Sequence, residues 1–150
     1  MKLTLMCLAL TLSTYTFANC NDDFNGGITE YNFAAKYFER GVNAYNTAIE
    51  LSQTANPDLT TICNHLVDAV TGFNVAADSY QGCLDFFTSA TTSCSGDDSQ
   101  SAIKNAEICQ NNHSIAFDNG NVVRNILQNS CYATTGQVLI DEGLSGVKTI

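Results

Sequence analysis

The sequence predicts an all-α protein: an antiparallel helical bundle of three long helices, or four, stapled by disulfides. Two long stretches carry apolar residues at alternating spacings of four and three, the heptad pattern of a helix that packs along one side. A polar segment around Gly96 and Asp97 separates them and indicates a hairpin between two helices. Six cysteines remain once a predicted leader peptide is removed, and their positions fit that hairpin.

The two heptad stretches match layer by layer when the chain folds back near residue 96, so that the numbers of facing residues add up to about 193. Phe73 then faces Gly120 and Tyr80 faces His113, which places large side chains opposite smaller ones. The predicted seams consist of Leu59, Cys63, Leu66, Val70, Phe73, Ala77, Tyr80, Leu84 and Phe87 in one stretch and of Ala102, Ala106, Cys109, His113, Ala116, Gly120, Val123 and Leu127 in the other.

Residues 1–18 have the features of a secretory signal peptide. Lys2 precedes an apolar run, and small residues ending at Ala18 predict cleavage there, which leaves residues 19–150 as one domain. An alternative is lipid attachment at Cys20, but Phe17 and Asn19 stand where small residues are usual. Since no segment reaches the roughly 20 apolar residues of a membrane helix, we expect no integral membrane protein. The predicted location is secreted, extracellular or periplasmic.

The charge of the processed chain argues against nucleic acid as a partner. Removing Lys2 leaves five Lys and Arg residues against 15 Asp and Glu, a formal net charge of about −10. Phosphate backbones are bound by clusters of basic residues, which this composition cannot supply. We therefore expect a protein partner and no nucleic acid.

The first helix is predicted from Thr29, as N-cap, to about Thr54, where Asn56 and Pro57 stop it. Residues 19–27 are polar and turn-rich and predict an irregular arm. The helix is apolar on two sides, which is typical of a central helix or of one with a contact surface. Its predicted seam is Tyr31, Ala35, Phe38, Val42, Tyr45 and Ile49, and its second stripe is Phe33, Tyr37, Ala44 and Leu51.

The second helix is predicted from Leu59, with Asp58 as N-cap, to about Ala90, and the third from about Ser99. Residues 118–120 favour a turn, so the third helix either breaks there, giving four helices, or continues to about Tyr132. We favour the continuous helix because the heptad register persists beyond this point. A short helix over residues 135–142 and a loose tail are predicted to follow.

The hairpin register restricts the disulfides, because the two Cα atoms of a bridge lie within about 7 Å of each other. Two pairs have numbers that add up to nearly 193, and the remaining two cysteines meet at the hairpin end of an up-down-up bundle. The predicted disulfides are Cys63 with Cys131, Cys83 with Cys109, and Cys20 with Cys94. The main alternative joins Cys83 to Cys94 and Cys20 to Cys109.

One pair of residues raises the question of chemistry. His113 follows Cys109 by one helical turn, a spacing that a metal site or a hydrolytic site could use. However, Cys63 and His65 lie near the other end of the hairpin. We expect Cys109 to be oxidised and His113 to form a hydrogen bond with Tyr80, and we predict no metal and no cofactor.

Residues 21–32 resemble an EF-hand calcium loop in part, with Asn21, Asp23 and Asn25 at alternate positions and Gly26 at the turn. The first ligand is not aspartate and Asn32 replaces the bidentate glutamate, so we do not expect calcium binding.

No nucleophile elbow of the form G-x-S-x-G and no glycine-rich phosphate loop occurs in the sequence, which predicts a protein that is not an enzyme. Residues 112–114 form a glycosylation sequon, which functions only if Asn112 faces outward.

The sequence-based hypothesis is a non-enzymatic binding protein of the inhibitor, immunity or host-interaction type, which recognises another macromolecule. The candidate partner face is Phe33, Tyr37 and Leu51 on the second stripe of the first helix. The alternative is a carrier of a small apolar ligand held between the helices. The residues around that ligand would be Phe38, Phe73, Tyr80 and Phe87.

Overall fold

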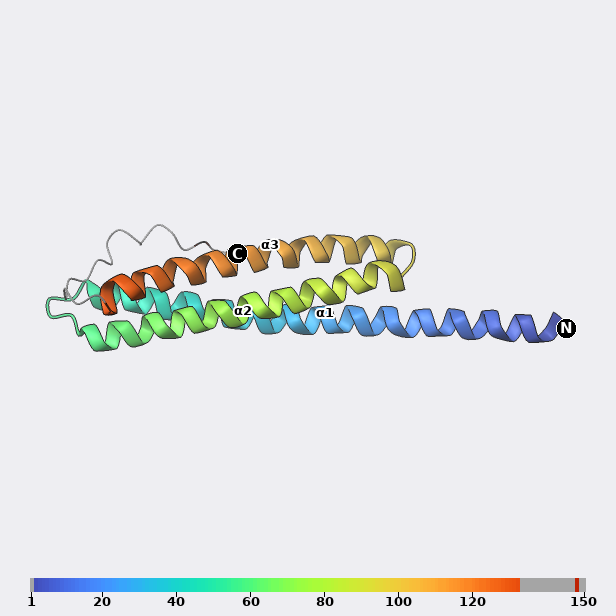
Figure 1. Cartoon of the computed structure of the whole chain (residues 1–150), viewed down its shortest axis with the longest axis horizontal. Coiled ribbons are helices and arrows are strands. Elements are labelled where there is room, and N and C mark those ends of the chain that lie inside the picture. Colours follow the sequence, from blue (N-terminus) through green and yellow to red (C-terminus); the bar gives the residue numbers. More distant parts are fainter. Residues whose placement is uncertain (1, 133–147, 149–150) are drawn as a thin grey trace.

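Three long helices form the fold, and consecutive helices run antiparallel (Figure 1). The structure is a computed structural model, which describes residues 2–132 and 148, with side chains described from Asn19 onward. The helices are α1 (Lys2–Ser52), α2 (Leu59–Ser93) and α3 (Asp97–Cys131). The third helix is continuous through residues 118–120, as the heptad register predicts. The predicted helix over residues 135–142 lies outside the described residues.

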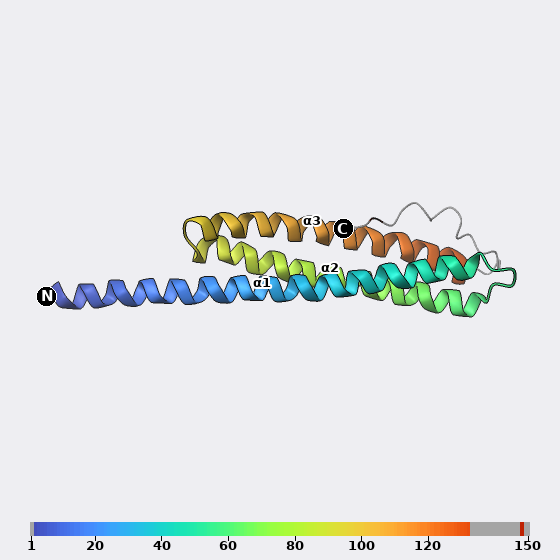
Figure 2. The ribbon, with the colours of Figure 1, turned by 180° about the vertical axis from the view of Figure 1, so that it is seen from behind.

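The second helix is the centre of the bundle. It packs along both of its neighbours, whereas among the described residues the backbones of α1 and α3 come close to each other at only a few positions. Figure 2 shows the bundle from behind: α2 lies between the other two helices toward the α2–α3 hairpin and crosses α1 farther along, so that α1 is drawn nearer to α3 beyond the crossing. The two contacts that α2 makes, one with α1 and one with α3, therefore determine the structure.

The contact between α2 and α3 follows the predicted register. The seam residues Leu66, Phe73 and Ala77 of α2 are buried, and so are Ala116, Val123 and Leu127 of α3. Two disulfides cross this seam, Cys63–Cys131 and Cys83–Cys109, each with its Cα atoms 5.9 Å apart. The third disulfide, Cys20–Cys94, joins α1 to the end of α2. All three predicted pairs are confirmed, and the alternative pairing is wrong.

The contact between α1 and α2 is different, because its centre is made of small residues at heptad spacing. Gly41 lies so close to Gly72 that a Cβ atom built on Gly72 would be 2.7 Å from the Gly41 nitrogen and 2.9 Å from the Tyr37 carbonyl oxygen. The backbones of the two helices therefore touch at this point. Buried small residues recur along both helices: Gly27, Ala34, Gly41 and Ala48 in α1 and Ala69, Gly72, Ala76 and Ala90 in α2.

This geometry corrects the predicted seam of α1. Phe38 and Tyr45 are buried as predicted, but Val42 and Ile49 are only half-buried, while Ala34 and Ala48 are completely buried. Compared with the predicted seam, the face of α1 that packs on the bundle therefore includes the small residues Ala34 and Ala48. Small residues carry little hydropathy signal, so an apolar stripe drawn through the large side chains misses them.

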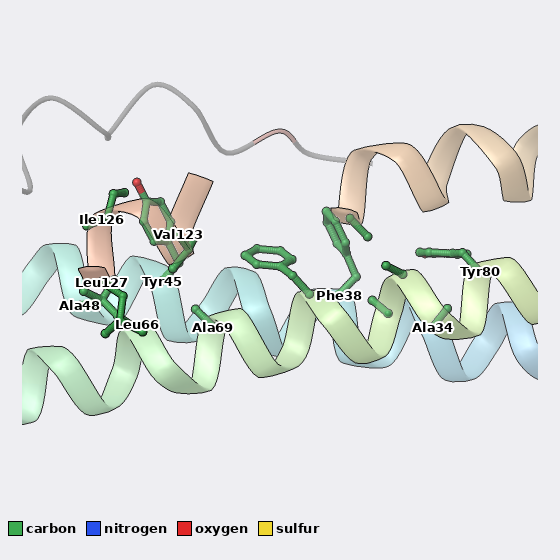
Figure 3. Packing of buried hydrophobic residues seen from close by; sticks show 14 of the residues in the cluster. Ala34, Phe38, Tyr45, Ala48, Leu66, Ala69, Tyr80, Val123, Ile126 and Leu127 are labelled. Atoms are coloured by element: carbon green, nitrogen blue, oxygen red, sulfur yellow. The ribbon is translucent and has the colours of Figure 1, made fainter. Parts of the chain in front are cut away.

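Aromatic rings fill the space between the helices. Phe38 of α1 packs edge-to-face on Phe73 of α2 with ring centroids 5.4 Å apart, and Tyr31 packs in the same way on Tyr80 at 5.7 Å. Farther along, Tyr45 of α1 belongs to the same buried cluster as Val123 and Ile126 of α3 (Figure 3). These large side chains connect α1 and α3 even where their backbones stay apart.

The prediction of an irregular arm over residues 19–27 is wrong, because α1 is helical throughout this stretch. Thr29 is not an N-cap either, since its hydroxyl donates to the Asn25 carbonyl oxygen one turn earlier at 2.7 Å. The local sequence favours a turn, but contacts with α2 override that preference. The disulfide of Cys20 with Cys94 holds this end of the helix, with the two Cα atoms 4.9 Å apart.

Three further contacts hold the same stretch against α2. Phe24 packs edge-to-face on Phe87 with centroids 5.4 Å apart. The Asp23 carboxylate accepts hydrogen bonds from the hydroxyls of Ser89 at 2.9 Å and Ser93 at 2.7 Å. The two glycines of the predicted turn allow the rings of α2 to lie against the backbone, since a Cβ at Gly27 would be 2.7 Å from the Phe87 ring. Glycine here permits close packing and does not end the helix.

The start of α2 at Leu59 agrees with the prediction, whereas the hairpin is shorter than predicted, because α2 continues to Ser93 and α3 begins at Asp97. Asp58 is the N-cap of α2, where it accepts from the Thr60 amide at 3.0 Å and the Thr61 hydroxyl at 2.6 Å. The bond from Thr61 lowers the pKa of Asp58. Gly96 adopts a positive φ of 61° in the hairpin between α2 and α3, a conformation that glycine allows without steric cost.

The first part of α1 extends past the hairpin of α2 and α3 and has no helix beside it (Figures 1 and 2). It contains residues 2–18, the stretch with the features of a signal peptide. Among the described residues, no helix is both long enough and apolar enough to cross a membrane.

Candidate binding surfaces

An aromatic pair lies on the outside of α1. The rings of Phe33 and Tyr37, one helical turn apart, are 4.7 Å between centroids. Phe33 is 47% exposed, a large value for a phenylalanine, whereas Tyr37 is half-buried and packs against the core at its base. Tyr37 thereby fixes the position of an aromatic surface that Phe33 presents to the solvent. Two of the three predicted partner-face residues thus lie together.

Leu51, the third predicted residue, is not part of this surface. It lies 14 residues farther along α1, about 21 Å at the helical rise per residue. Its side chain is half-buried and packs against the main hydrophobic cluster. The structure therefore limits the candidate face to the part of α1 near Phe33 and Tyr37.

A groove of about 490 Å³ begins at Tyr37 and follows the outer side of the contact between α1 and α2. Its lining residues include Lys36 and Arg40 of α1 and His65 and Asp68 of α2. Arg40 and Asp68 form an ion pair at 3.8 Å, with both side chains more than half exposed. Such a pair contributes little to stability, and both groups remain available to charges on another molecule. The groove and the aromatic pair together offer apolar and charged contacts side by side.

A second, apolar groove of about 180 Å³ lies between α1 and α3 near the hairpin end. Ile28 of α1 and Ile108 of α3 form its rims and are 49% and 48% exposed, and Phe87 of α2 is among the other lining residues. Sequence reasoning missed this groove because the first helix was predicted to begin only at Thr29, just after Ile28. Ile108, an apolar residue beside the seam residue Cys109, was the available signal.

His113 is held differently from the prediction. Its Nδ1 lies 2.9 Å from the Ala77 carbonyl oxygen and donates to it, and its ring stacks on Phe117 with centroids 6.2 Å apart. The Tyr80 hydroxyl lies beside the Asn112 side chain and not the His113 ring. The predicted bond between His113 and Tyr80 is therefore wrong. Burial raises the pKa of Tyr80 to about 12, and the nearby Tyr31 adds to the rise.

The surroundings of His113 offer little for catalysis. Cys109 is bonded to Cys83, so it cannot act as a thiolate nucleophile or metal ligand while the disulfide is intact. His65 lines the charged groove between α1 and α2, away from His113. Among residues 19–132 and Lys148, no three His, Cys, Asp or Glu side chains gather closely enough to hold a metal ion.

The glycosylation sequon is inaccessible in the folded chain. Asn112 is only 4% exposed, and its side chain contacts Tyr80 within the bundle. A glycan attached to Asn112 would have to displace α2 from α3, so the folded protein does not present this asparagine for modification.

Fold and surfaces together define a disulfide-linked three-helix bundle with an aromatic and charged face on α1. Comparison of the chain with protein-family models, with curated proteins and with solved structures finds no match.

Proposed function

We propose that this protein is an exported, non-enzymatic binding protein that recognises another protein through the face of α1 at Phe33 and Tyr37. The observation that carries the proposal is the aromatic pair, in which a half-buried Tyr37 supports a Phe33 that is 47% exposed. Aromatic residues that are rigidly held at a surface are enriched among the residues that dominate binding energy in protein interfaces.

The groove beside the pair supports a protein as the partner. Lys36, Arg40 and Asp68 surround Tyr37 with charges of both signs, an arrangement that complements a mixed protein surface. Two of the five Lys and Arg residues after Ala18 lie here, in a chain whose formal charge is strongly negative. A purely apolar ligand would gain nothing from these charges.

The scaffold supports export and a fixed surface. Disulfides form and persist in oxidising compartments, and three of them connect the helices of this bundle. Each connects residues that are distant in the sequence, so the helices cannot separate without reduction. A surface on such a scaffold binds with little loss of conformational entropy, which favours affinity.

The alternative function, a carrier of a small apolar ligand, fits the structure less well. Phe38, Phe73, Tyr80 and Phe87 are at most 7% exposed and pack on one another or on neighbouring rings, so the space predicted for a ligand holds side chains. The apolar groove between α1 and α3, at about 180 Å³, is smaller than the roughly 300 Å³ at which ligand pockets begin.

The test is a comparison of retained partners. Wild-type protein and the double variant Phe33→Ala/Tyr37→Ala are immobilised and exposed to extracts of the native compartment, and retained proteins are quantified by mass spectrometry. We expect a partner of the wild type to fall at least tenfold on the double variant, because the two rings are the centre of the proposed interface. Phe117→Ala is the matched control, since this ring is 55% exposed on α3.

Retention of the same partners by the double variant, at the same level, would show that another surface or another function is involved. Circular dichroism melts of both variants verify that the bundle is intact. A native mass spectrum of the purified wild type tests the carrier: a bound apolar molecule would favour that alternative.

A further inference from the structure

Near the middle of α3, the side chain of one buried residue is bonded to the main chain near the C-terminus. Asn119 is completely buried, and its amide makes two hydrogen bonds with Lys148. The Asn119 Nδ2 donates to the Lys148 carbonyl oxygen at 2.7 Å, and the Lys148 backbone N–H donates to the Asn119 Oδ1 at 2.8 Å. The side chain of Lys148 makes a separate contact: its Nζ lies 3.1 Å from an Asp118 carboxylate oxygen.

The two main-chain bonds select backbone geometry. The N–H and the C=O of one residue point to the same side when the chain is extended, as in the hydrogen-bonded pairs of an antiparallel sheet. The Asn119 amide presents one donor and one acceptor side by side, so it takes the place of a neighbouring strand. This contact depends on the main chain of Lys148 and not on the identity of its side chain.

The ion pair with Asp118 adds little to this contact. Both side chains are more than half exposed, so solvent screens their interaction. The buried amide is the stronger part, because a buried polar group left without its partners costs free energy. A buried asparagine needs a donor and an acceptor, and the main chain of Lys148 supplies both.

We propose that Asn119 is a binding site for an extended main-chain segment and that the main chain of this protein's own Lys148 occupies the site in cis. Covalent linkage gives this segment a high effective concentration at the site, so that a peptide added from outside competes poorly until the internal contact is weakened. The site lies on α3 and is separate from the aromatic face on α1. The proposal for Asn119 is therefore independent of the proposed function.

The first experiment uses the full chain and a fluorescein-labelled peptide with the sequence of residues 141–150. Lys148→Pro removes the N–H that donates to Asn119 and weakens the internal contact. We expect the peptide to bind Lys148→Pro with a Kd at least tenfold lower than that for the wild type, measured by fluorescence anisotropy. Adding Asn119→Asp should abolish the gain, because a carboxylate cannot donate to a carbonyl oxygen.

The matched control is Asn111→Asp in the Lys148→Pro background. It introduces the same charge at an exposed position of α3, and we expect it to keep the peptide affinity of Lys148→Pro. Equal binding to wild type and Lys148→Pro, no binding to Lys148→Pro, or undiminished binding after Asn119→Asp would each overturn the proposal.

A second measurement requires no peptide. Hydrogen exchange at the Lys148 amide should be slowed in the wild type and in the control Asn111→Leu, and should reach the rate of an unstructured peptide in Asn119→Leu, because leucine removes the oxygen that accepts this N–H. An unprotected Lys148 amide in the wild type, or full protection in Asn119→Leu, contradicts the internal contact directly.

Discussion

The two seams of α2 are built on opposite plans. Toward α3, the seam contains large buried side chains such as Leu66 and Phe73, and two disulfides cross it. Toward α1, small residues bring the two backbones into contact at Gly41 and Gly72, and one disulfide closes the far end. The stability of the seam with α3 depends on large side chains that fill it. The close approach of α1 and α2 depends on glycines that have no side chain.

The two seams are sensitive to opposite changes in side-chain size. In the seam with α3, loss of a methylene leaves a cavity, and stability falls in proportion to the space left behind. In the seam with α1, addition of a methyl group forces two helices apart. The amino-terminal stretch of α1 adds a third case, because its local sequence favours a turn and only contacts with α2 keep it helical.

The largest effect is expected from the disulfides. Replacing Cys20 and Cys94 with serine releases a bridge between residues 74 apart in sequence and should lower the free energy of unfolding by about 4 kcal/mol. It should also free residues 19–27 to exchange amide hydrogens rapidly, because their helix depends on this contact. Guanidinium unfolding and hydrogen exchange of this stretch measure the two effects.

The matched control is the serine variant of Cys63 and Cys131, whose bridge joins residues 68 apart. We expect a similar global loss with the protection of residues 19–27 retained under native conditions. Equal exchange of this stretch in both variants would show that the α1 end does not depend on its own bridge, and the contrast between the seams would disappear.

The next effect is expected at the contact of the two backbones. Gly72→Ala places a methyl group 2.7 Å from the Gly41 nitrogen, and should destabilise the protein by about 3 kcal/mol, or lower Tm by about 10 °C. The control is Gly82→Ala, where the nearest atoms belong to the Glu30 side chain at 3.4 Å. That variant should gain up to about 1 kcal/mol from helix propensity.

Thermal melts by circular dichroism measure both glycine variants. Destabilisation of the same size in Gly72→Ala and Gly82→Ala would mean that α1 and α2 do not approach as closely as the structure shows.

The smallest effect concerns Tyr80, which contacts Tyr31 of α1 and Asn112 of α3 and so belongs to both seams. Its pKa is raised to about 12 from the ordinary value of 10.0, so between these pH values the unfolded tyrosine loses its proton while the folded one keeps it. Stability is therefore full below pH 10 and falls as pH rises toward 12. Tyr80→Phe should reduce this fall by about 2–3 kcal/mol.

Urea unfolding at several pH values between 9 and about 12 measures the slope, with short incubations to protect the disulfides. Burial also raises the pKa of Tyr45, so part of the slope should remain in Tyr80→Phe. An identical slope in Tyr80→Phe and wild type contradicts the prediction.

The seam with α3 could be predicted from sequence because its periodic large residues carry a strong hydropathy signal. The same register placed Cys63 opposite Cys131 and Cys83 opposite Cys109, and left Cys20 for Cys94. The seam with α1 could not be predicted in this way, because glycine and alanine at a contact look the same as at an exposed position. The Asn, Asp and Gly residues within 19–27 favour a turn locally, but contacts with α2 keep this stretch helical.

The binding surfaces were predictable in part. Phe33 and Tyr37 belong to one helical stripe, so their proximity followed from helix geometry. The contacts of His113 and Tyr80 could not be predicted from helix geometry. The register places residues opposite each other, but it does not determine which carbonyl or amide group a side chain contacts. The contact of Asn119 with Lys148 joins a helix to a residue beyond the bundle, where no periodic pattern exists to guide prediction.

The meeting of Gly41 with Gly72 has a consequence for ancestry. Any side chain at position 72 would press on the main chain of α1, and main chain cannot adopt another rotamer to make room. Descendants of a common ancestor should therefore keep glycine at position 72 even after most surface residues have diverged. Together with the spacing of the six cysteines, it gives a fingerprint by which distant kin can be recognised when overall similarity has faded.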